Sequence, residues 1–425
     1  MSKTGKDYVV VVQAPAIGLG GGRFATESAF AIHLKALRAD LGADFARLVV
    51  VAPQMQKSIY EKNLNSFGCI TEDADGIVFV PAHENGVSPG QFWTKELIPF
   101  WKRLTVVLSS AGYVQTGLAS DIKVPYLAVV NARVWLKRIP STFIIDIDFR
   151  QMSRRFYRTG VWSRKSYLVN RLIHDPFKKL QVWLAVRASN LALLKSPSMV
   201  ADYGAGRPHV KDFLDAAHSA REVVTHELLE NRLAARAEKS RPLEVVYFGR
   251  FVPYKGLDLA LDAVEHAIRR GANIRLTFIG SGECLDSLRR RAETPELRDA
   301  VTFVAPVPYG DQLFDLIDGA DVTIAAPKTE DTPRAALDSM ARGLPIVAFD
   351  IDYFKNLADK SGAVALAEWP SPESLADRLV ELDNDRSSVA KMARHAVVFA
   401  QANTQEIWLK RRTEWTQAAY SAGRS

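Results

Sequence analysis

The sequence predicts an α/β protein built from two doubly wound domains. Three observations lead to this fold class. Short β-branched runs alternate with longer helical patterns, and the alternation occurs in two successive series along the chain. A polar, irregular stretch separates the two series. The 425 residues are enough for two domains, each with its own core. Alternating strands and helices are typical of parallel sheets that are covered on both faces.

The first series supplies six predicted strands and two predicted helices. Runs rich in β-branched and aromatic residues favour strands, which we expect at residues 8–13, 47–52, 76–80, 104–109, 125–130 and 143–147. Apolar residues at helical spacing predict helices over residues 23–41 and 91–102. We expect this series to form an N-terminal domain over residues 1–200.

The second series repeats the pattern in the other half of the chain. Predicted strands cover residues 244–248, 274–280, 301–305, 321–325, 345–349 and 363–366. Predicted helices cover residues 257–270, 310–318, 333–342 and 372–383. We expect a C-terminal domain over residues 201–402, with the junction in the polar stretch 203–241.

The first loop with candidate chemistry follows the strand 244–248. It contains Gly249-Arg250 and Lys255-Gly256, directly before a predicted helix. Parallel sheets bind ligands at the carboxyl ends of their strands, and a helix N-terminus there favours an anion. Arginine grips a phosphate with two N–H groups, and lysine adds a point charge. The loop therefore predicts a phosphate site, and two exposed surface cations are the alternative.

The second loop follows the strand 321–325 and contains two acids. Thr332 suits the N-cap of the next helix, Pro333 its first position, and Gly343 its C-terminal cap. Glu330 precedes this helix, and Asp338 lies about 7.5 Å along its axis at 1.5 Å per residue. Two carboxylates so placed can accept hydrogen bonds from hydroxyls on two different rings. A cap carboxylate and a polar helix face are the alternative, which the spacing alone favours.

Two further loops are rich in glycine. Gly280 ends the strand 274–280, and Gly20, Gly21 and Gly22 follow the first strand of the chain. Glycine permits sharp turns and close approach of the backbone to a ligand. The loop with Gly20, Gly21 and Gly22 does not fit the spacing of a dinucleotide-binding fingerprint. A plain turn is the alternative for each loop.

Composition limits the class of protein and its compartment. Hydrophobic residues are 48% and charged residues 24%, an ordinary globular balance that excludes disordered and fibrous classes. No apolar run is long enough to cross a bilayer, and two cysteines in 425 residues fit a reducing compartment. We therefore expect a cytoplasmic protein. The net charge of +7 favours anionic partners.

Much of the positive charge lies in residues 133–196. This stretch contains fourteen lysines and arginines against three acids, a local net charge of +11. Aromatic residues are interleaved with the cations. This mixture predicts contact with an anionic membrane surface, where cations meet head groups and aromatic rings lie at the boundary. An ordinary basic face is the alternative, and nucleic acid is not expected because no binding motif for it is present.

The second half of the chain resembles the donor-binding domain of glycosyltransferase family 4, whose members are retaining enzymes of GT-B fold. Three features support the resemblance: Gly249-Arg250 with Lys255-Gly256, the acids Glu330 and Asp338 separated by seven residues, and the run 341–348. It covers residues 244–400 well. The N-terminal half is similar only in layout and in its glycine-rich first loop.

The resemblance implies a GT-B fold, with an acceptor-binding domain over residues 1–200, a donor-binding domain over 201–402, a cleft between them, and a helix in 403–425 that returns to the first domain. It implies Arg250, Lys255 and Glu330 as catalytic residues. The expected donor-binding residues are Gly20, Gly21, Gly22, Gly249, Arg250, Lys255, Gly280, Glu330, Thr332 and Asp338. No metal and no cofactor besides the nucleotide-sugar substrate are expected.

The expected function is transfer of a hexose with retention, a UDP-sugar being the first choice of donor. The acceptor would be a lipid-linked sugar or glycolipid at the cytoplasmic face of the membrane, in synthesis of bacterial surface polysaccharide or glycolipid. A sugar-nucleotide epimerase of GT-B fold is one alternative. A degenerate scaffold is another. It would explain the run Asp331-Thr332-Pro333 and the absence of a histidine after the strand predicted at 125–130, where Asn131 and Arg133 stand.

Overall fold

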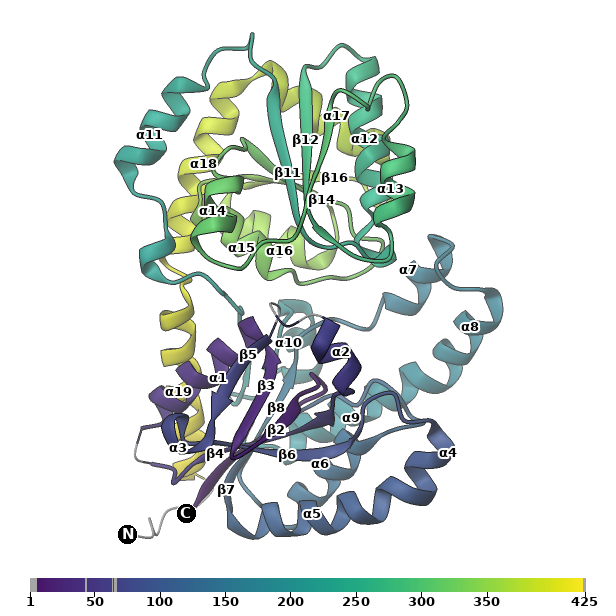
Figure 1. The fold of residues 1–425 in the computed structure, drawn as a ribbon, viewed down its shortest axis with the longest axis vertical. Helices are drawn as coiled ribbons and strands as arrows, with labels where there is room; N and C mark the ends of the chain where they lie inside the picture. Colours follow the sequence, from purple (N-terminus) through teal and green to yellow (C-terminus); the bar gives the residue numbers. More distant parts are fainter. Residues whose placement is uncertain (1–5, 43, 63, 65–66, 423–425) are drawn as a thin grey trace. The chain divides into compact units, whose positions relative to one another are not determined.

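The computed structural model describes residues 6–42, 44–62, 64 and 67–422. The chain divides into two compact units that are not consecutive in sequence (Figure 1). Unit 1 contains the chain up to Asp146, the segment Asn170–Phe213 and the chain from Leu409 on. Unit 2 contains Ile147–Val169 and Leu214–Trp408. A segment from the first half of the sequence, Ile147–Val169, therefore belongs to the same unit as the second half.

Unit 1 is built on a parallel sheet of seven strands in the order β10-β9-β8-β7-β1-β4-β6, with a separate antiparallel sheet β2-β3-β5. Its strands are β1 (Asp7–Val11), β2 (Ile17–Gly20), β3 (Arg23–Glu27), β4 (Leu48–Gln54), β5 (Phe67–Thr71), β6 (Ile77–Glu84), β7 (Ala111–Gly117), β8 (Ser141–Ile145), β9 (Leu191–Leu194) and β10 (Val210–Lys211). Its helices are α1 (Ser28–Leu41), α2 (Lys57–Lys62), α3 (Glu72–Asp75), α4 (Pro89–Gln91), the π-helix η2 (Phe92–Glu96), α5 (Leu97–Ser110), α6 (Tyr126–Leu136), the π-helix η3 (Asn170–His174), α9 (Asp175–Ala188) and α10 (Pro197–Gly204).

Three predictions in unit 1 are wrong. Residues 104–109 are not a strand: they belong to α5, where Phe100, Leu104 and Leu108 are buried at helical spacing. Residues 125–130 are not a strand either, because α6 buries its apolar residues with the same period. The predicted helix 23–41 begins only at Ser28, since the preceding residues pair with β5 in the antiparallel sheet. In the first two cases, β-branched residues within an apolar run of a helix imitated a strand.

The C-terminal helix contains residues of both units. Helix α19 (Gln405–Ala422) begins in unit 2 and continues in unit 1. Within unit 1, the Tyr420 ring packs against Phe45 and Tyr113, with centroids 5.2 Å and 6.1 Å apart. This helix is the returning C-terminal helix of the predicted fold.

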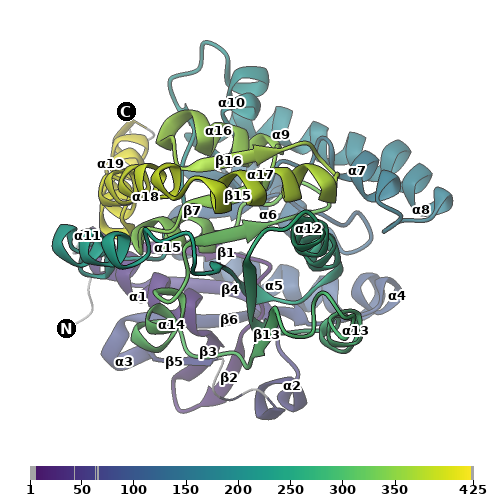
Figure 2. The same ribbon diagram turned by 90° about the horizontal axis from the view of Figure 1, so that it is seen from above.

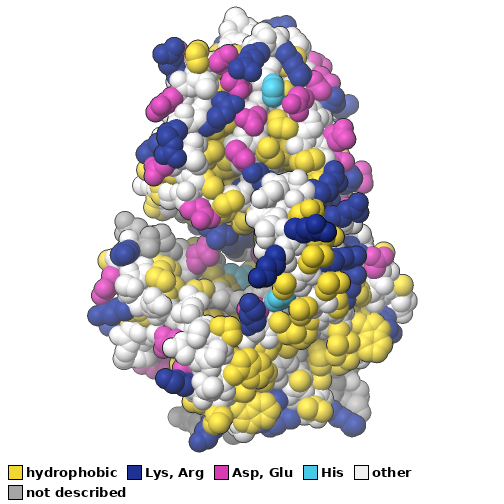
Figure 3. Space-filling model, turned by 90° about the vertical axis from the view of Figure 1, so that its right-hand side faces the viewer, with side chains coloured by type: hydrophobic (Ala, Val, Ile, Leu, Met, Phe, Trp, Pro, Cys, Tyr) yellow, Lys and Arg dark blue, Asp and Glu magenta, His cyan; other side chains and the backbone are white. Residues whose placement is uncertain are grey.

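Part of the exterior of unit 1 is apolar (Figure 3). Large hydrophobic side chains are exposed on η2, α5, η3 and α9, among them Trp93, Ile98, Trp101, Val106, Leu172, Ile173, Leu180 and Trp183. Cations lie among them: the Arg133 guanidinium is 3.9 Å from the centre of the Trp101 ring, and Arg187 is equally close to Trp183. We call these eight side chains with Arg133 and Arg187 the apolar–basic surface. It extends outside the predicted stretch 133–196.

The stretch 133–196 itself is divided between the units. Arg150 and Arg155 lie in the segment that belongs to unit 2, and each pairs with an acid, Asp148 and Glu330. Lys178, in unit 1, is buried, and burial lowers its pKa. Several cations of this stretch therefore face other parts of the protein, and the contact with an anionic membrane stays a prediction.

Unit 2 is built on a parallel sheet of six strands in the order β13-β12-β11-β14-β15-β16. Its strands are β11 (Leu243–Arg250), β12 (Ile274–Ser281), β13 (Val301–Val304), β14 (Val322–Ala325), β15 (Ile346–Phe349) and β16 (Val364–Ala367). Its helices are α7 (Met152–Arg158), α8 (Arg164–Val169), η4 (Ala220–Glu222), α11 (His226–Ala235), η5 (Pro253–Lys255), α12 (Leu257–Arg269), α13 (Leu285–Arg291), α14 (Asp311–Ile317), α15 (Arg334–Ala341), α16 (Asp352–Ser361), α17 (Pro372–Asn384) and α18 (Arg386–Gln401), where η4 and η5 are 3₁₀-helices.

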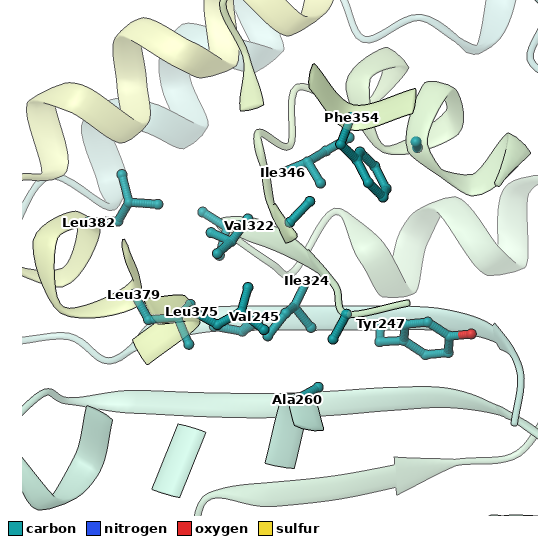
Figure 4. Packing of buried hydrophobic residues seen from close by; sticks show 14 of the residues in the cluster. Val245, Tyr247, Ala260, Val322, Ile324, Ile346, Phe354, Leu375, Leu379 and Leu382 are labelled. Atoms are coloured by element: carbon teal, nitrogen blue, oxygen red, sulfur yellow. The ribbon is translucent and has the colours of Figure 1, made fainter. Parts of the chain in front are cut away.

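The central strand β11 has apolar residues on both faces. Val245 and Tyr247 belong to the large cluster that includes α12 and α17, part of which is shown in Figure 4. Val246 and Phe248 belong to a second cluster with α14. Because successive side chains of a strand point to opposite faces, helices must cover both sides of this sheet, as Figure 2 shows. The six strands and four helices predicted for the second half are all confirmed, with ends shifted by at most two residues.

Candidate functional site

The site of unit 2 lies where the order of its strands reverses. Strand β11 has β12 on one side and β14 on the other, so the chain continues in opposite directions from it. In doubly wound sheets, ligands bind at such a point, outside the carboxyl ends of the strands. The loops that follow β11 and β14 are those that contain Arg250, Lys255 and Glu330. The sheet thus brings together two loops whose motifs are about 75 residues apart in sequence.

The two loops touch through their backbones. Gly256 has a φ of +65°, and a Cβ at this position would lie 1.8 Å from the carbonyl oxygen of Ala326. The backbone N–H of Lys328 donates to the carbonyl of Tyr254 at 2.8 Å. Gly280 fills a similar role between neighbouring strands, because a Cβ there would lie 2.0 Å from the carbonyl oxygen of Gly249. Glycine is required at both positions by space as well as by φ.

The two predicted phosphate-binding cations differ in their surroundings. Lys255 is mostly buried, and its Nζ lies 2.5 Å from Oδ2 of Asp331. Arg250 is exposed, and no ion pair of its side chain is found within the described ranges. Gly256 is the N-cap residue of α12, which has thirteen residues. A charged loop before a helix N-terminus gives a site for an anion, and one cation already has a carboxylate partner.

Glu330 is buried, with a side chain that is 2% exposed. Its Oε1 accepts the backbone N–H of Asp352 at 3.3 Å and forms an ion pair with Nη1 of Arg155. Burial raises the pKa of Glu330 to about 7, against the favourable charge of Arg155, and Asp352 and Asp148 raise it further. The carboxyl group is therefore close to the balance between its neutral and ionised forms near neutral pH.

Asp338 lies in α15 and is also buried. Its Oδ1 accepts the Tyr309 hydroxyl at 3.1 Å and lies 3.8 Å from Nδ1 of the buried His218. Burial raises the pKa of Asp338 to about 7. A ligand hydroxyl at this carboxylate would share it with Tyr309.

The predicted cap of helix α15 needs a correction. The helix begins at Arg334, and Pro333 takes the N-cap position that was predicted for Thr332. No side chain caps the helix through a hydrogen bond. Gly343 follows the last turn with a φ of +75°, as predicted for the C-terminal end.

Arg155 reaches Glu330 from α7, in the segment Ile147–Val169. Its guanidinium lies 5.2 Å from the centre of the Trp369 ring, and that of Arg158 lies 5.0 Å from the same ring. Trp369 is itself fixed, since its Nε1 donates to the carbonyl of Pro327 at 3.2 Å and its backbone N–H to Asp350 at 2.9 Å. The sequence analysis missed Arg155 and Trp369, because neither lies in a motif and about 175 residues separate Arg155 from Glu330.

In unit 1, the glycine-rich run forms the turn between β2 and β3. Gly20, Gly21 and Gly22 all have a positive φ, of 79°, 58° and 66°. The run therefore belongs to a hairpin, and the expectation that it joins a strand directly to a helix is wrong. Beside it lies a pocket of about 440 Å³, whose lining includes Gly18 and polar side chains from three elements, Gln54 of β4, Lys57, Tyr60 and Glu61 of α2, and Glu84 of β6.

The site of unit 2 suits a ligand that combines an anion with hydroxyl groups. Arg250, Lys255 and the N-terminus of α12 offer positive charge, and the buried carboxyl groups of Glu330 and Asp338 offer acceptors. Within the described part of the chain, no three His, Cys, Asp or Glu side chains are grouped as a metal site would require. None of the described helices has the length and hydropathy to span a bilayer.

Comparison with known proteins points in the same direction. Residues 230–397 match the family model described as "Glycosyl transferases group 1". The amylovoran biosynthesis glycosyltransferase AmsK of Erwinia amylovora is 26% identical over 163 residues, which are 37% of this chain and 40% of that protein. The GDP-mannose:cellobiosyl-diphosphopolyprenol alpha-mannosyltransferase of Xanthomonas oryzae pv. oryzae is 30% identical over 147 residues, 33% of this chain and 38% of that protein. The chain thus matches well under half the length of these relatives.

Solved structures resemble the chain over nearly its whole length. The Anabaena protein Alr3699/HepE, crystallised in complex with UDP, aligns with a TM-score of 0.65 at 14% identity, covering 97% of this chain and 100% of that one. Neighbours of this kind have the GT-B fold, with two Rossmann-like domains on parallel sheets. The chain has the GT-B fold.

Proposed function

We propose that this chain is a glycosyltransferase that moves a hexose from a nucleotide-sugar donor with retention at the anomeric carbon. The observation that supports this most directly is the contact between the two loops that contain Arg250, Lys255 and Glu330, at the reversal point of the sheet in unit 2. That sheet lies within the region that matches the glycosyl transferases family model. A UDP-sugar is the first choice of donor, since HepE is a structural neighbour crystallised with UDP and UDP-glucose.

In the proposed reaction, the bond between the anomeric carbon and the donor diphosphate breaks, and a bond from that carbon to an acceptor oxygen forms. The diphosphate leaves with increasing negative charge. Arg250, Lys255 and the N-terminus of α12 stabilise this charge without a metal. The proton of the acceptor hydroxyl passes to the departing diphosphate or to water.

The remaining predicted residues are assigned to the donor. Glu330 accepts hydrogen bonds from sugar hydroxyls, Asp338 binds the ribose together with Tyr309, and Thr332 contacts the donor beside them. Gly249 and Gly280 allow the backbone to approach the ligand, and Gly20, Gly21 and Gly22 of unit 1 are assigned to the diphosphate. These roles follow the resemblance to family 4.

For the acceptor, we propose a lipid-linked sugar or glycolipid at the cytoplasmic face of a membrane. The apolar–basic surface of unit 1 combines exposed tryptophans with arginines, which suits the boundary of an anionic bilayer. A polyprenol-linked sugar occurs in the name of the Xanthomonas relative, and polysaccharide synthesis in that of AmsK. The pocket beside β2, with its amide, carboxylate and tyrosine groups, is the proposed site for the acceptor sugar.

Thermal stabilisation by nucleotides tests the donor site. UDP, GDP, ADP and TDP are each added without metal to the wild type, to Lys255→Ala and to the control Arg275→Ala, whose side chain is 64% exposed on β12. One nucleotide should raise the melting temperature of the wild type and of the control, but not of Lys255→Ala. A shift of equal size in Lys255→Ala would overturn the phosphate assignment. No shift with any nucleotide would favour a scaffold without donor binding.

A further inference from the structure

Both protein contacts of the Glu330 carboxylate fall on the same oxygen. The backbone N–H of Asp352 and the guanidinium of Arg155 both reach Oε1. Among the described residues, no hydrogen bond to Oε2 is found. The carboxylate is thus fixed at one oxygen and has a second oxygen with open acceptor capacity.

Arg155 is itself held in place by its surroundings. Its side chain is 14% exposed and lies against the face of Trp369. Trp369 is fixed through its indole N–H and its backbone N–H, so the ring gives the guanidinium a rigid surface. The three groups come from different elements: α7, the loop after β14, and the loop after β16. A contact made by three separate elements holds the carboxylate in one orientation.

We propose that Arg155 is a positioning residue for the donor sugar, which holds Oε1 of Glu330 so that Oε2 accepts a hydrogen bond from a sugar hydroxyl. The inference rests on the proposed function, because it assumes that a sugar lies beside Glu330. It assigns a role to the segment Ile147–Val169, which comes from the first half of the sequence and supplies this arginine to unit 2.

The charges around Glu330 determine what the arginine does. Asp352 on α16 and Asp148 before α7 oppose ionisation of Glu330, and Asp148 is partly neutralised by its ion pair with Arg150. Arg155 is the cation that favours the ionised form. Without it, burial and the two acids would raise the pKa of Glu330 above its present value of about 7. A neutral carboxylic acid is a weaker acceptor than a carboxylate.

The first experiment requires no donor. The protein is labelled with ¹³C at the glutamate carboxyl carbons, and Glu330→Gln identifies the resonance of Glu330. The titration midpoint in Arg155→Gln should lie roughly one to three pH units above that of the wild type, which is the effect of losing an adjacent opposite charge. Arg155→Lys keeps the positive charge, so its titration midpoint should lie close to that of the wild type. An unchanged midpoint in Arg155→Gln would overturn the inference for any donor.

The second experiment compares UDP with UDP-glucose by calorimetry. UDP lacks the sugar, so its affinity should be the same in the wild type and Arg155→Gln. UDP-glucose should bind Arg155→Gln roughly tenfold more weakly at pH 7, the usual effect of losing a hydrogen bond to a charged group, and should recover as pH rises. Arg158→Gln is the matched control, because Arg158 faces the same ring and no ion pair is found for it within the described ranges.

The outcomes separate the inference from the proposed function. If UDP-glucose binds wild type and Arg155→Gln equally at every pH, the positioning role is wrong while the donor site stands. If the wild type binds neither ligand but the titration midpoint moves, the UDP-sugar proposal is wrong and the hold of Arg155 on Glu330 stands. If Arg158→Gln loses as much UDP-glucose affinity as Arg155→Gln, the effect belongs to the whole helix, and the inference fails.

Discussion

The two parallel sheets of this chain have the same general design but different chemistry at the loops that follow their strands. In unit 2, the loops after β11 and β14 contain paired cations and acids within a few residues of the strand ends. In unit 1, the first strands lead to a hairpin of three glycines and to a pocket of mixed polar groups. One sheet therefore has a site for a charged ligand with local sequence motifs. The other has a site whose residues come from several short segments without a motif.

The comparison teaches that similar topology does not fix function. Both sheets reverse strand order beside their first strand, and both are covered by helices. In unit 2, this point is combined with Arg250 and Lys255 directly before the N-terminus of α12. If this difference determines what each unit does, variants in unit 2 should affect donor chemistry, and variants in the pocket or on the apolar–basic surface of unit 1 should affect the acceptor side.

The largest effect is expected from Arg250→Ala and Lys255→Ala. Each should lower kcat/KM for the donor by roughly 10²–10³, the usual cost of removing one group that stabilises developing negative charge. The rate of nucleoside diphosphate release, with the donor selected by thermal stabilisation, measures this. Arg275→Ala, an exposed cation on β12, should keep wild-type rates. A similar loss in Arg275→Ala would mean that general charge, and not the loop, is responsible.

The next effect concerns the contact between the two loops of unit 2. Gly256→Ala should destabilise the protein by more than about 1–3 kcal/mol, because backbone strain at its φ is added to a clash with the Ala326 carbonyl. Gly271→Ala is the matched control, with a φ of +86° and open space around its Cβ position. Urea unfolding compares the two. Equal losses would show that φ alone matters and that the close approach of the loops is unimportant.

A smaller effect concerns pH. Burial raises the pKa of Asp338 from 3.8 to about 7, so the folded state binds a proton that the unfolded state releases between these values. The contribution of Asp338 to the free energy of unfolding is therefore fully present below pH 4 and is lost as pH rises to 7. Relative to the wild type, Asp338→Asn should therefore gain stability with rising pH over this window, by on the order of 2 kcal/mol.

Asp385 provides the control for that measurement. Hydrogen bonds from Ser387 and Ser388 lower its pKa to about 2, and it is exposed. Asp385→Asn should leave the slope of stability between pH 4 and 7 unchanged, since Asp385 is ionised in both states there. If Asp338→Asn shows the same slope as the wild type, the burial of Asp338 has no linkage to folding.

How much the sequence could predict differs between the units for physical reasons. In unit 2, the strands are short runs rich in apolar residues, and the loop motifs lie within single strand-to-helix connections. The elements and the loops that contain Lys255 and Glu330 therefore followed from local patterns. In unit 1, the β-branched residues 105–107 of α5 imitated a strand although two of the three are exposed, and β3 depends on pairing with the distant β5. Local pattern cannot distinguish these cases.

Contacts between segments that are distant in the sequence could not be predicted either. Asp331 was noted only as part of the run Asp331-Thr332-Pro333, yet it pairs with Lys255. Arg155 was counted as one of fourteen cations of a predicted membrane surface, yet it faces Glu330. No feature of the sequence indicated that the Tyr309 hydroxyl donates to Asp338. Each pairing depends on how strands are ordered in the sheet, and that order is a property of the whole fold.

The smallest expected effect tests the apolar–basic surface of unit 1. Trp101→Ala and Trp183→Ala should each weaken binding to anionic vesicles roughly fivefold, since each ring is about half exposed and available to the bilayer boundary. Co-sedimentation with vesicles of phosphatidylglycerol and phosphatidylcholine measures this, and binding should fall with salt. Val398→Ser, on an exposed position of α18 in unit 2, is the control. Two results would contradict the proposal: a loss of binding in Val398→Ser as large as in the tryptophan variants, or equal binding to neutral and anionic vesicles. In either case the surface of unit 1 does not select an anionic membrane. The acceptor must then be sought among molecules that do not reside in a membrane.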